Sequence, residues 1–356
     1  MLGFDYRAAK AAWTVFLMAL LLVIIYYTRT VLLVFVLAIL FAYLLAPAVD
    51  LVGRWFPRPV PRSYALAIVY TIFIGVLILA GFLIGNRVAE EAATLAQGFP
   101  KLEKTLEQRL AEPGPAWMQP VKGYLLSQLR ERAQSFSTVL LPVLEKAAAH
   151  VLSVLGSLVF VVLIPVLSFF LLKDGKTLLN TALETVKEER RAMWQDIASD
   201  IHILLGQFIR ALVLLSIATF VFYSAFFSIM GVPYAVLLAS VAGALEFIPM
   251  FGPLTAAIMI VLVAAFTGYP HVFAILAFLA AYRVFQDYIL NPHLMSSGVA
   301  LHPMLVIIGA LAGEALAGIP GVFLSVPVLA TLRVVFVRIR KGSIPGAPRH
   351  TTGLES

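Results

Sequence analysis

Four polar side chains recur at helical spacing late in the sequence. Arg283, Gln286, Asp287 and Asn291 fall at i, i+3, i+4 and i+8, so one helix would carry them close to a single face. Arg283 follows 36 residues without an Asp, Glu, Lys or Arg, so this face begins deep in apolar sequence. Arg283 and Asp287 can neutralise each other, or the whole face can form a polar wall of a solute path. The sequence leaves both interpretations open.

Glu246 is the second candidate, because it interrupts the longest uncharged tract of the chain. Burial disfavours the charged form of a carboxyl group, so we expect its pKa to be raised, and the group could carry a coupling proton. The alternative is that Glu246 caps free N–H groups of a broken helix. Glu314 is open to the same two interpretations.

Two segments around these carboxyl groups combine a Glu, an Ile-Pro pair and a Gly, and we predict helix breaks over 246–253 and 314–321. Pro removes a backbone donor and Gly permits positive φ, so each break frees backbone polar groups. Lipid cannot satisfy those groups, and they must face protein or a water-filled cavity. The candidate site residues in these two segments are Glu246, Pro249, Gly252, Pro253, Glu314 and Pro320.

The elements that carry these residues are predicted to be membrane helices. Eight stretches of 18 or more residues lack Asp, Glu, Lys and Arg, and a bilayer core needs about 20 apolar residues per helix. The chain is 61% hydrophobic and only 13% charged, whereas soluble domains carry about 25% charged residues. We predict an all-α polytopic membrane helix bundle of about 6–8 spans, with two broken, re-entrant helical hairpins and an extracytoplasmic helical insertion.

The predicted organisation has five parts. They are three spans in residues 1–87, with a tight turn at Arg29; an amphipathic extracytoplasmic insertion at 88–150; two spans in 151–232, with a cytoplasmic amphipathic helix at 176–206; a core transport region at 233–340; and a disordered cytoplasmic tail at 341–356.

Orientation follows from the basic segments that flank the apolar stretches, which place both termini in the cytoplasm. The last third then fits either two opposed hairpins, over 234–267 and 303–337, or full crossings by some of their arms. We favour the hairpins.

The predicted insertion carries apolar residues at heptad spacing, which indicates a helix with one apolar seam. This seam predicts either a helix packed on its own neighbour or a contact between subunits. Its residues are Val88, Ala92, Leu95, Phe99, Leu102 and Leu106.

Several function classes are unsupported by the sequence. The six His show no metal-ligand spacing and there is no Cys, so we predict neither a metal site nor a cofactor. No nucleophile elbow or complete phosphate-binding loop occurs, so we predict neither an enzyme nor an ATPase. The net charge of +7 lies largely at membrane flanks, which argues against nucleic-acid binding.

An ordered set of short motifs resembles the autoinducer-2 exporter (AI-2E) family of PerM-like permeases, over nearly the whole chain. The motifs are Phe169–Gly175, Gly231–Tyr234, Glu246–Pro253, Gln286–Pro292, Leu301–Pro303, Gly318–Gly321 and Val326–Pro327. The resemblance implies a bacterial or archaeal inner-membrane protein that exports small molecules as a homo-oligomer. It links family members to export of autoinducer-2, a quorum-sensing signal, or to sodium–proton antiport.

We therefore predict a multi-pass permease that exports a small polar solute without its own ATPase, with a solute or cation and the lipid bilayer as partners. The first alternative is a sodium (or lithium)/proton antiporter. The second is a non-transporting membrane scaffold, for which Arg283 and Asp287 would need only to pair with each other.

Overall fold

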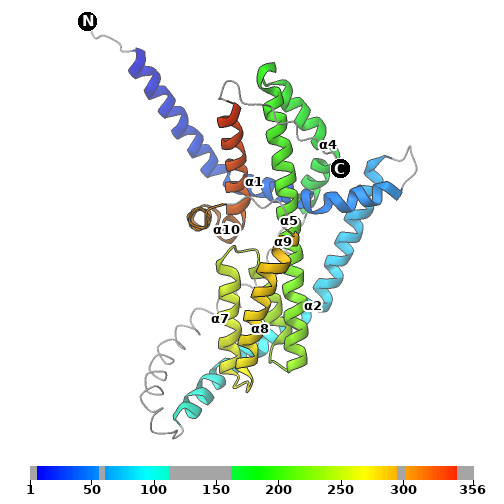
Figure 1. Cartoon of the computed structure of the whole chain (residues 1–356), viewed down its shortest axis with the longest axis vertical. Helices are drawn as coiled ribbons and strands as arrows, with labels where there is room; N and C mark the ends of the chain where they lie inside the picture. The colour runs from blue at the N-terminus through cyan, green and yellow to red at the C-terminus, as the bar shows by residue number, and fades with distance from the viewer. Residues whose placement is uncertain (1–5, 56–60, 112–161, 295–300, 343–356) are drawn as a thin grey trace. The chain divides into compact units, whose positions relative to one another are not determined.

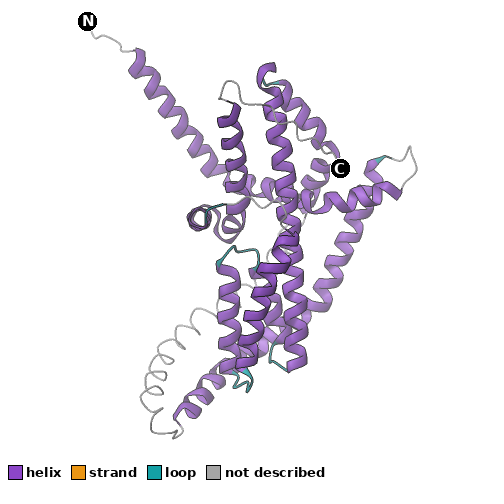
Figure 2. Cartoon of the chain, in the orientation of Figure 1, coloured by secondary structure: helices purple, strands orange, loops and turns teal. Residues whose placement is uncertain are grey.

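The computed structural model describes residues 6–55, 61–111, 162–294 and 301–342 (Figure 1). Among these residues the backbone is almost entirely helical and contains no strand (Figure 2). The helices are α1 (Tyr6–Trp55), α2 (Arg62–Ala111), α4 (Ile164–Glu184), α5 (Glu188–Met230), α6 (Ala235–Leu245), α7 (Phe251–Phe266), α8 (Val272–Phe285), the π-helical η3 (Gln286–Leu290), α9 (Asn291–Leu294) and α10 (Pro303–Gly342).

Length and composition distinguish two groups among these helices. Five segments are long and apolar enough to cross a membrane, and they lie in α1, α2, α5, α8–α9 and α10. The short apolar helices α6 and α7 have 11 and 16 residues, which makes them about 16 and 24 Å long, less than a bilayer core of about 30 Å. Large apolar side chains are exposed along the long helices, as lipid contact requires. The predicted all-α polytopic membrane protein is confirmed.

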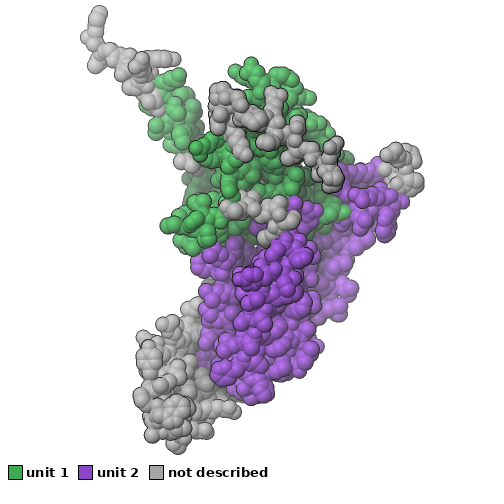
Figure 3. All heavy atoms as spheres, viewed as in Figure 1, with its two compact units in different colours: residues 1–47, 162–206, 297–356 green, residues 48–161, 207–296 purple. Residues whose placement is uncertain are grey.

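The chain divides into two compact units (Figure 3). Unit 1 comprises residues 1–47, 162–206 and 297–356, and unit 2 comprises residues 48–161 and 207–296. Both α1 and α5 continue from one unit into the other. Glu246 and the polar residues of α8 and η3 all belong to unit 2.

The predicted turn at Arg29 was wrong, because α1 continues through it without interruption. No Gly or Pro lies between Gly3 and Pro47, so nothing in this stretch favours a turn. The hydroxyl of Thr28 donates to the carbonyl of Ile24 at 2.7 Å, as is common within helices. Arg29 lies over the ring of Tyr26, 4.7 Å from its centroid.

The single amphipathic helix predicted over 176–206 is divided between α4 and α5. Thr185 caps the end of α4, where its backbone N–H donates to the carbonyl of Ala182. The first turn of α5 then carries Glu188 and Glu189, whose negative charges suit a helix N-terminus. Helical periodicity continues across residues 185–187, so only these two end signals mark the division between α4 and α5.

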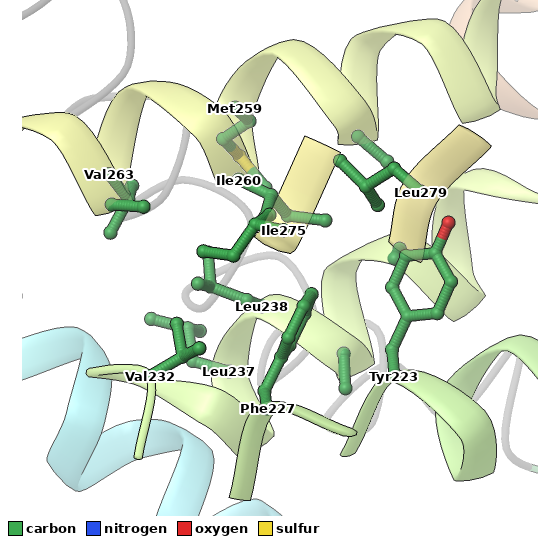
Figure 4. Packing of buried hydrophobic residues seen from close by; sticks show 14 of the residues in the cluster. Tyr223, Phe227, Val232, Leu237, Leu238, Met259, Ile260, Val263, Ile275 and Leu279 are labelled. Atoms are coloured by element: carbon green, nitrogen blue, oxygen red, sulfur yellow. The ribbon is translucent and has the colours of Figure 1, made fainter. Parts of the chain in front are cut away.

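The core of unit 2 is built from α5, α6, α7 and α8 (Figure 4). Phe227, Leu238, Ile260 and Ile275 are almost completely buried in it, one from each helix. Leu95 of α2 is buried in the same cluster, with Val88 and Ala92 packed beside it. The first half of the predicted heptad seam thus contacts its own chain. The side chains of Phe99, Leu102 and Leu106, in the second half of the seam, lie outside the described residues. Residues 112–150 of the predicted insertion and residues 343–356 of the predicted tail also lie outside them.

In unit 1, α10 contains a sharp reversal within its 40 residues. Ala317 and Gly318 leave the helical region, and Gly318 has φ +64°, a value that favours glycine. The backbones of Gly313 and Gly321 approach so closely that a Cβ on Gly321 would lie 1.9 Å from the carbonyl oxygen of Gly313. Small residues at this spacing let two helical arms pack back to back.

Candidate functional site

The turn between α6 and α7 positions Glu246. It covers Glu246–Met250, and the N–H of Ile248 donates to the carbonyl of Leu245 at 2.9 Å. Gly252 is required here, because a Cβ on it would lie 1.8 Å from the carbonyl oxygen of Leu245. Pro253 lies in the first turn of α7, where its missing N–H leaves no intrahelical hydrogen bond unmade. Pro249 and Gly252 therefore shape the turn, and Glu246 begins it.

Glu246 is buried, with only 8% of its surface exposed, and both carboxyl oxygens accept hydrogen bonds. Thr219 of α5 donates to Oε1 at 3.1 Å, and the Gln286 amide donates from Nε2 to Oε2 at 2.9 Å. Both partners are uncharged and themselves almost fully buried, at 1% and 3% exposed. The carboxyl group is thus held by neutral donors from two other helical segments.

Tyr282 extends this network by one step. Its hydroxyl lies 2.9 Å from the Thr219 hydroxyl, and either oxygen can be the donor. While Thr219 donates its single hydrogen to Glu246, it must accept from Tyr282. The network therefore runs from Tyr282 through Thr219 to Glu246, with Gln286 on the other carboxyl oxygen.

Thr219 and Tyr282 were not among the site residues predicted from the sequence. A signal existed for Tyr282, because it stands four residues before Gln286 and so shares its side of the helix. Thr219 has no local signal, since an isolated Thr in a membrane helix commonly bonds within its own turn. Only the packing of α5 against the α6–α7 turn reveals it.

Aromatic rings surround the network. Phe222 and Phe285 contact the ring of Tyr282, and so does Tyr223, at a centroid distance of 5.0 Å. Phe226 stacks on Phe278 at 3.9 Å within the same cluster. Such surroundings hold little water, so hydrogen bonds to Glu246 are stronger than in water and an unmet one is more costly.

Arg283, Asp287 and Asn291 form contacts among themselves and are not members of this hydrogen-bond network. The Nε atom of Arg283 forms an ion pair with Asp287 at 2.9 Å, with the side chains 48% and 39% exposed. Asn291 donates to Asp287 at 3.2 Å. The expectation that Gln286 would share their face was wrong, because successive helical residues are about 100° apart. Gln286 therefore points inward while Asp287 remains at the surface, and the π-helical turn η3 begins at this point.

Glu314 and Pro320 belong to α10 in unit 1. Glu314 is exposed, just before the reversal at Ala317–Gly318, and Pro320 is partly buried just after it. Glu246 and Glu314 thus lie in different units. A site shared between the two breaks stays a prediction.

Comparison of the sequence with known proteins places the chain in a family. A sequence profile described as AI-2E family transporter matches residues 15–341, nearly the whole chain. The chain belongs to the AI-2E family. Its resemblance to that family, which rested on short motifs, is thereby confirmed.

Individual relatives of this AI-2E family protein come from bacteria and archaea. YrrI of Bacillus subtilis, provisionally named a transport protein, is 24% identical over 319 residues that cover 88% of each chain. PerM of Escherichia coli K12, provisionally named a permease, is 27% identical over 280 residues, 77% of this chain and 78% of PerM. A provisionally named transport protein of Methanothermobacter thermautotrophicus is 26% identical over 327 residues, 88% of this chain and 90% of its own length. Together with its long apolar helices, these matches identify a multi-pass membrane transporter.

The chemistry available to this AI-2E family protein at Glu246 is acid–base and hydrogen-bonding chemistry. Within the described ranges, no three His, Asp or Glu side chains converge as ligands for a metal ion. Hydroxyl, phenol, amide and carboxyl groups do converge, and each can exchange donor and acceptor roles or reorient.

Proposed function

We propose that this protein is a secondary transporter that exports a small polar solute, with Glu246 as the group that carries the coupling proton. The observation that carries this proposal is the burial of the Glu246 carboxyl group beside a broken helical hairpin, with only neutral hydrogen-bond partners. An intramembrane carboxyl group of this kind marks a solute path or a proton relay.

The neighbouring charges support a protonatable Glu246. Arg283 is the first Arg or Lys after Glu246 in sequence, and it forms its ion pair with Asp287. Burial of an isolated carboxylate costs free energy because the charge is removed from water, and binding a proton neutralises that charge. Arg283 and Asp287 still act on Glu246 through space, and the phenols of Tyr223 and Tyr282 face it from α5 and α8.

The hydrogen-bond network suits both protonation states. With Glu246 charged, Thr219 and Gln286 donate to its two oxygens. With Glu246 neutral, the added proton on Oε1 is donated to Thr219, whose own hydrogen turns to the Tyr282 oxygen. Because hydroxyl groups reorient easily, proton binding and release need no large movement of the side chains.

The solute and the setting rest on the family. Autoinducer-2 is one candidate solute, because hydroxyl-rich molecules suit carboxyl, amide and hydroxyl partners. We further propose a homo-oligomer in the plasma (inner) membrane of a bacterium or archaeon, with both termini cytoplasmic, and α6–α7 as a re-entrant hairpin. The short lengths of α6 and α7 support the hairpin.

Exchange of sodium or lithium for protons is the second candidate function. Three oxygen-bearing side chains follow one another at hydrogen-bond distance: the carboxyl group of Glu246, the hydroxyl of Thr219 and the phenol of Tyr282. Oxygen atoms are the ligands that hard cations prefer. The Gln286 amide would have to turn its oxygen toward such a cation.

A flux screen in proteoliposomes tests both candidates. The full-length protein is reconstituted with a trapped pH-sensitive dye, and sodium, lithium and small polyols are added in turn under an imposed pH gradient. We expect one class of solute to drive proton movement in the wild type and not in Glu246→Gln. The exposed Glu90 of α2 provides the matched control, Glu90→Gln, which should behave like the wild type. Equal proton movement in wild type and Glu246→Gln would exclude a coupling role for Glu246.

A further inference from the structure

The N-terminus of α6 depends on another helix for one of its backbone hydrogen bonds. The first turn of any α-helix leaves N–H groups without partners inside the helix. In α6 the first internal bond joins the N–H of Leu238 to the carbonyl of Tyr234. Tyr234, in the N-cap position, has φ 58° and makes no side-chain capping bond. The N–H of Leu237 therefore needs an acceptor from elsewhere.

Glu91 of α2 supplies that acceptor. Its Oε2 atom accepts a hydrogen bond from the N–H of Leu237 at 2.8 Å, across 146 residues of sequence. Its Oε1 atom lies 3.9 Å from the Nε of Arg87, whose side chain is 71% exposed, while Glu91 itself is only 20% exposed. A negative charge at a helix N-terminus is also favoured by the helix dipole. Glu91 thus caps α6 from a neighbouring helix.

Further contacts fix the geometry of this cap. Val88 and Ala92, on either side of Glu91, pack against the core of unit 2. Glu91 is therefore held at the start of α6 by the packing of α2.

The opposite end of α6 leads directly into Glu246. The helix has 11 residues and is about 16 Å long, so it transmits displacement as a short rod. Near its C-terminal end the hydroxyl of Ser216 donates to the carbonyl of Gly243 at 2.7 Å. A Cβ on Gly243 would lie 3.0 Å from the carbonyl oxygen of Ser216, so α5 and α6 are in close contact there. The end of α6 that leads into Glu246 is thus held against α5, while its start is held against α2 by Glu91.

We propose that Glu91 is a positioning residue, which sets the place of Glu246 through α6. The role of Glu246 in this statement rests on the proposed function, whereas the cap itself does not.

The test compares Glu91→Ala, Glu91→Gln and Glu90→Ala with the wild type, all as full-length protein in lipid nanodiscs. Hydrogen exchange is measured on peptides from α6 and α7. Loss of a capping bond raises local opening about fivefold. We expect the amides at the start of α6 to exchange about that much faster in Glu91→Ala, whereas α7 should be unchanged. Glu91→Gln keeps an acceptor oxygen and should restore slow exchange, and Glu90→Ala should match the wild type.

The second readout is the pH profile of proton flux in proteoliposomes with trapped dye. Glu91→Ala should lose the pH dependence of the wild type, and Glu91→Gln should regain it. Unchanged exchange at α6 in Glu91→Ala would overturn the proposal, and so would faster exchange with an unaltered pH profile. If Glu246→Gln retains wild-type flux, the proposed function fails, but the exchange data still decide whether Glu91 holds α6. Should Glu91→Ala not fold, Glu91→Asp replaces it, because its shorter side chain cannot reach Leu237.

Discussion

The Thr219 hydroxyl lies 3.1 Å from Oε1 of Glu246 and joins α5 to the turn between α6 and α7. Thr219 is 1% exposed, so water does not replace this bond if it is lost. The same hydroxyl reaches Tyr282 on α8. One small side chain thus connects three segments of unit 2 at the carboxyl group on which the proposed function depends.

Replacement of Thr219 by Val tests this link with almost no change of shape. It removes a buried donor to a charged group, a loss of about 1.5–3 kcal/mol, so we expect proton-coupled flux to fall by about tenfold or more. Thr219→Ser keeps the hydroxyl and should retain most of the flux. Ser228→Ala changes an exposed hydroxyl on the same helix and serves as the control. Equal flux in Thr219→Val and the wild type would remove Thr219 from the relay.

Tyr282→Phe separates the hydroxyl from the packing of the ring. Phe keeps the contacts with Phe222 and Tyr223, so the melting temperature in detergent should stay close to that of the wild type. Proton-coupled flux should fall, because Thr219 loses the partner that lets it accept the proton of Glu246. Tyr288→Phe is the matched control, since the Tyr288 side chain is 77% exposed. If both variants transport equally well, the proton relay ends at Thr219 and does not include the Tyr282 hydroxyl.

An exchange of the two charges at Arg283 and Asp287 distinguishes a structural pair from a solute path. The exchange keeps opposite charges four residues apart on the same helix, so the double variant Arg283→Asp/Asp287→Arg can form the ion pair in reverse and should melt near the wild type. We expect the solute flux of this variant to fall, because the positive and negative charges on the polar wall have then changed places. Full flux in the double variant would favour the interpretation that the two residues only pair with each other and do not line the solute path.

Gly252 offers a test of the turn itself. A Cβ at this position would overlap the carbonyl of Leu245, and overpacking of this kind costs about 1–3 kcal/mol, so Gly252→Ala should lower the melting temperature. Gly85 on α2 has open space around it, and Gly85→Ala should be neutral or stabilising, because Ala favours a helix. A melting temperature for Gly252→Ala at or above that of Gly85→Ala would contradict the close approach of the two backbones.

The helical class and Glu246 as a candidate could be predicted from sequence because both depend on local composition. Uncharged stretches long enough for a bilayer identify membrane helices wherever they fold. The placement of Glu246 beside Pro249 and Gly252 marked a break, since those residues have backbone requirements of their own.

The partners of Glu246 could not be predicted, because they depend on which helices pack together. Thr219 precedes Glu246 by 27 residues and Gln286 follows it by 40. Periodicity placed Gln286 close to the face of Asp287, although the two residues are about 100° apart on the helix, and the packing of α8 determines that Gln286 is the buried one. The turn at Arg29 was predicted from a charge within an apolar run, whereas a long helix accommodates one Arg by placing it over Tyr26.

Infrared difference spectroscopy of the lipid-embedded protein tests most directly whether Glu246 binds and releases a proton. Spectra recorded across a pH titration separate the C=O stretch of a protonated carboxyl group from the bands of a carboxylate. We expect a C=O band that forms and disappears reversibly with pH in the wild type and is missing in Glu246→Gln. Identical carboxyl bands in the two proteins at every pH would contradict it.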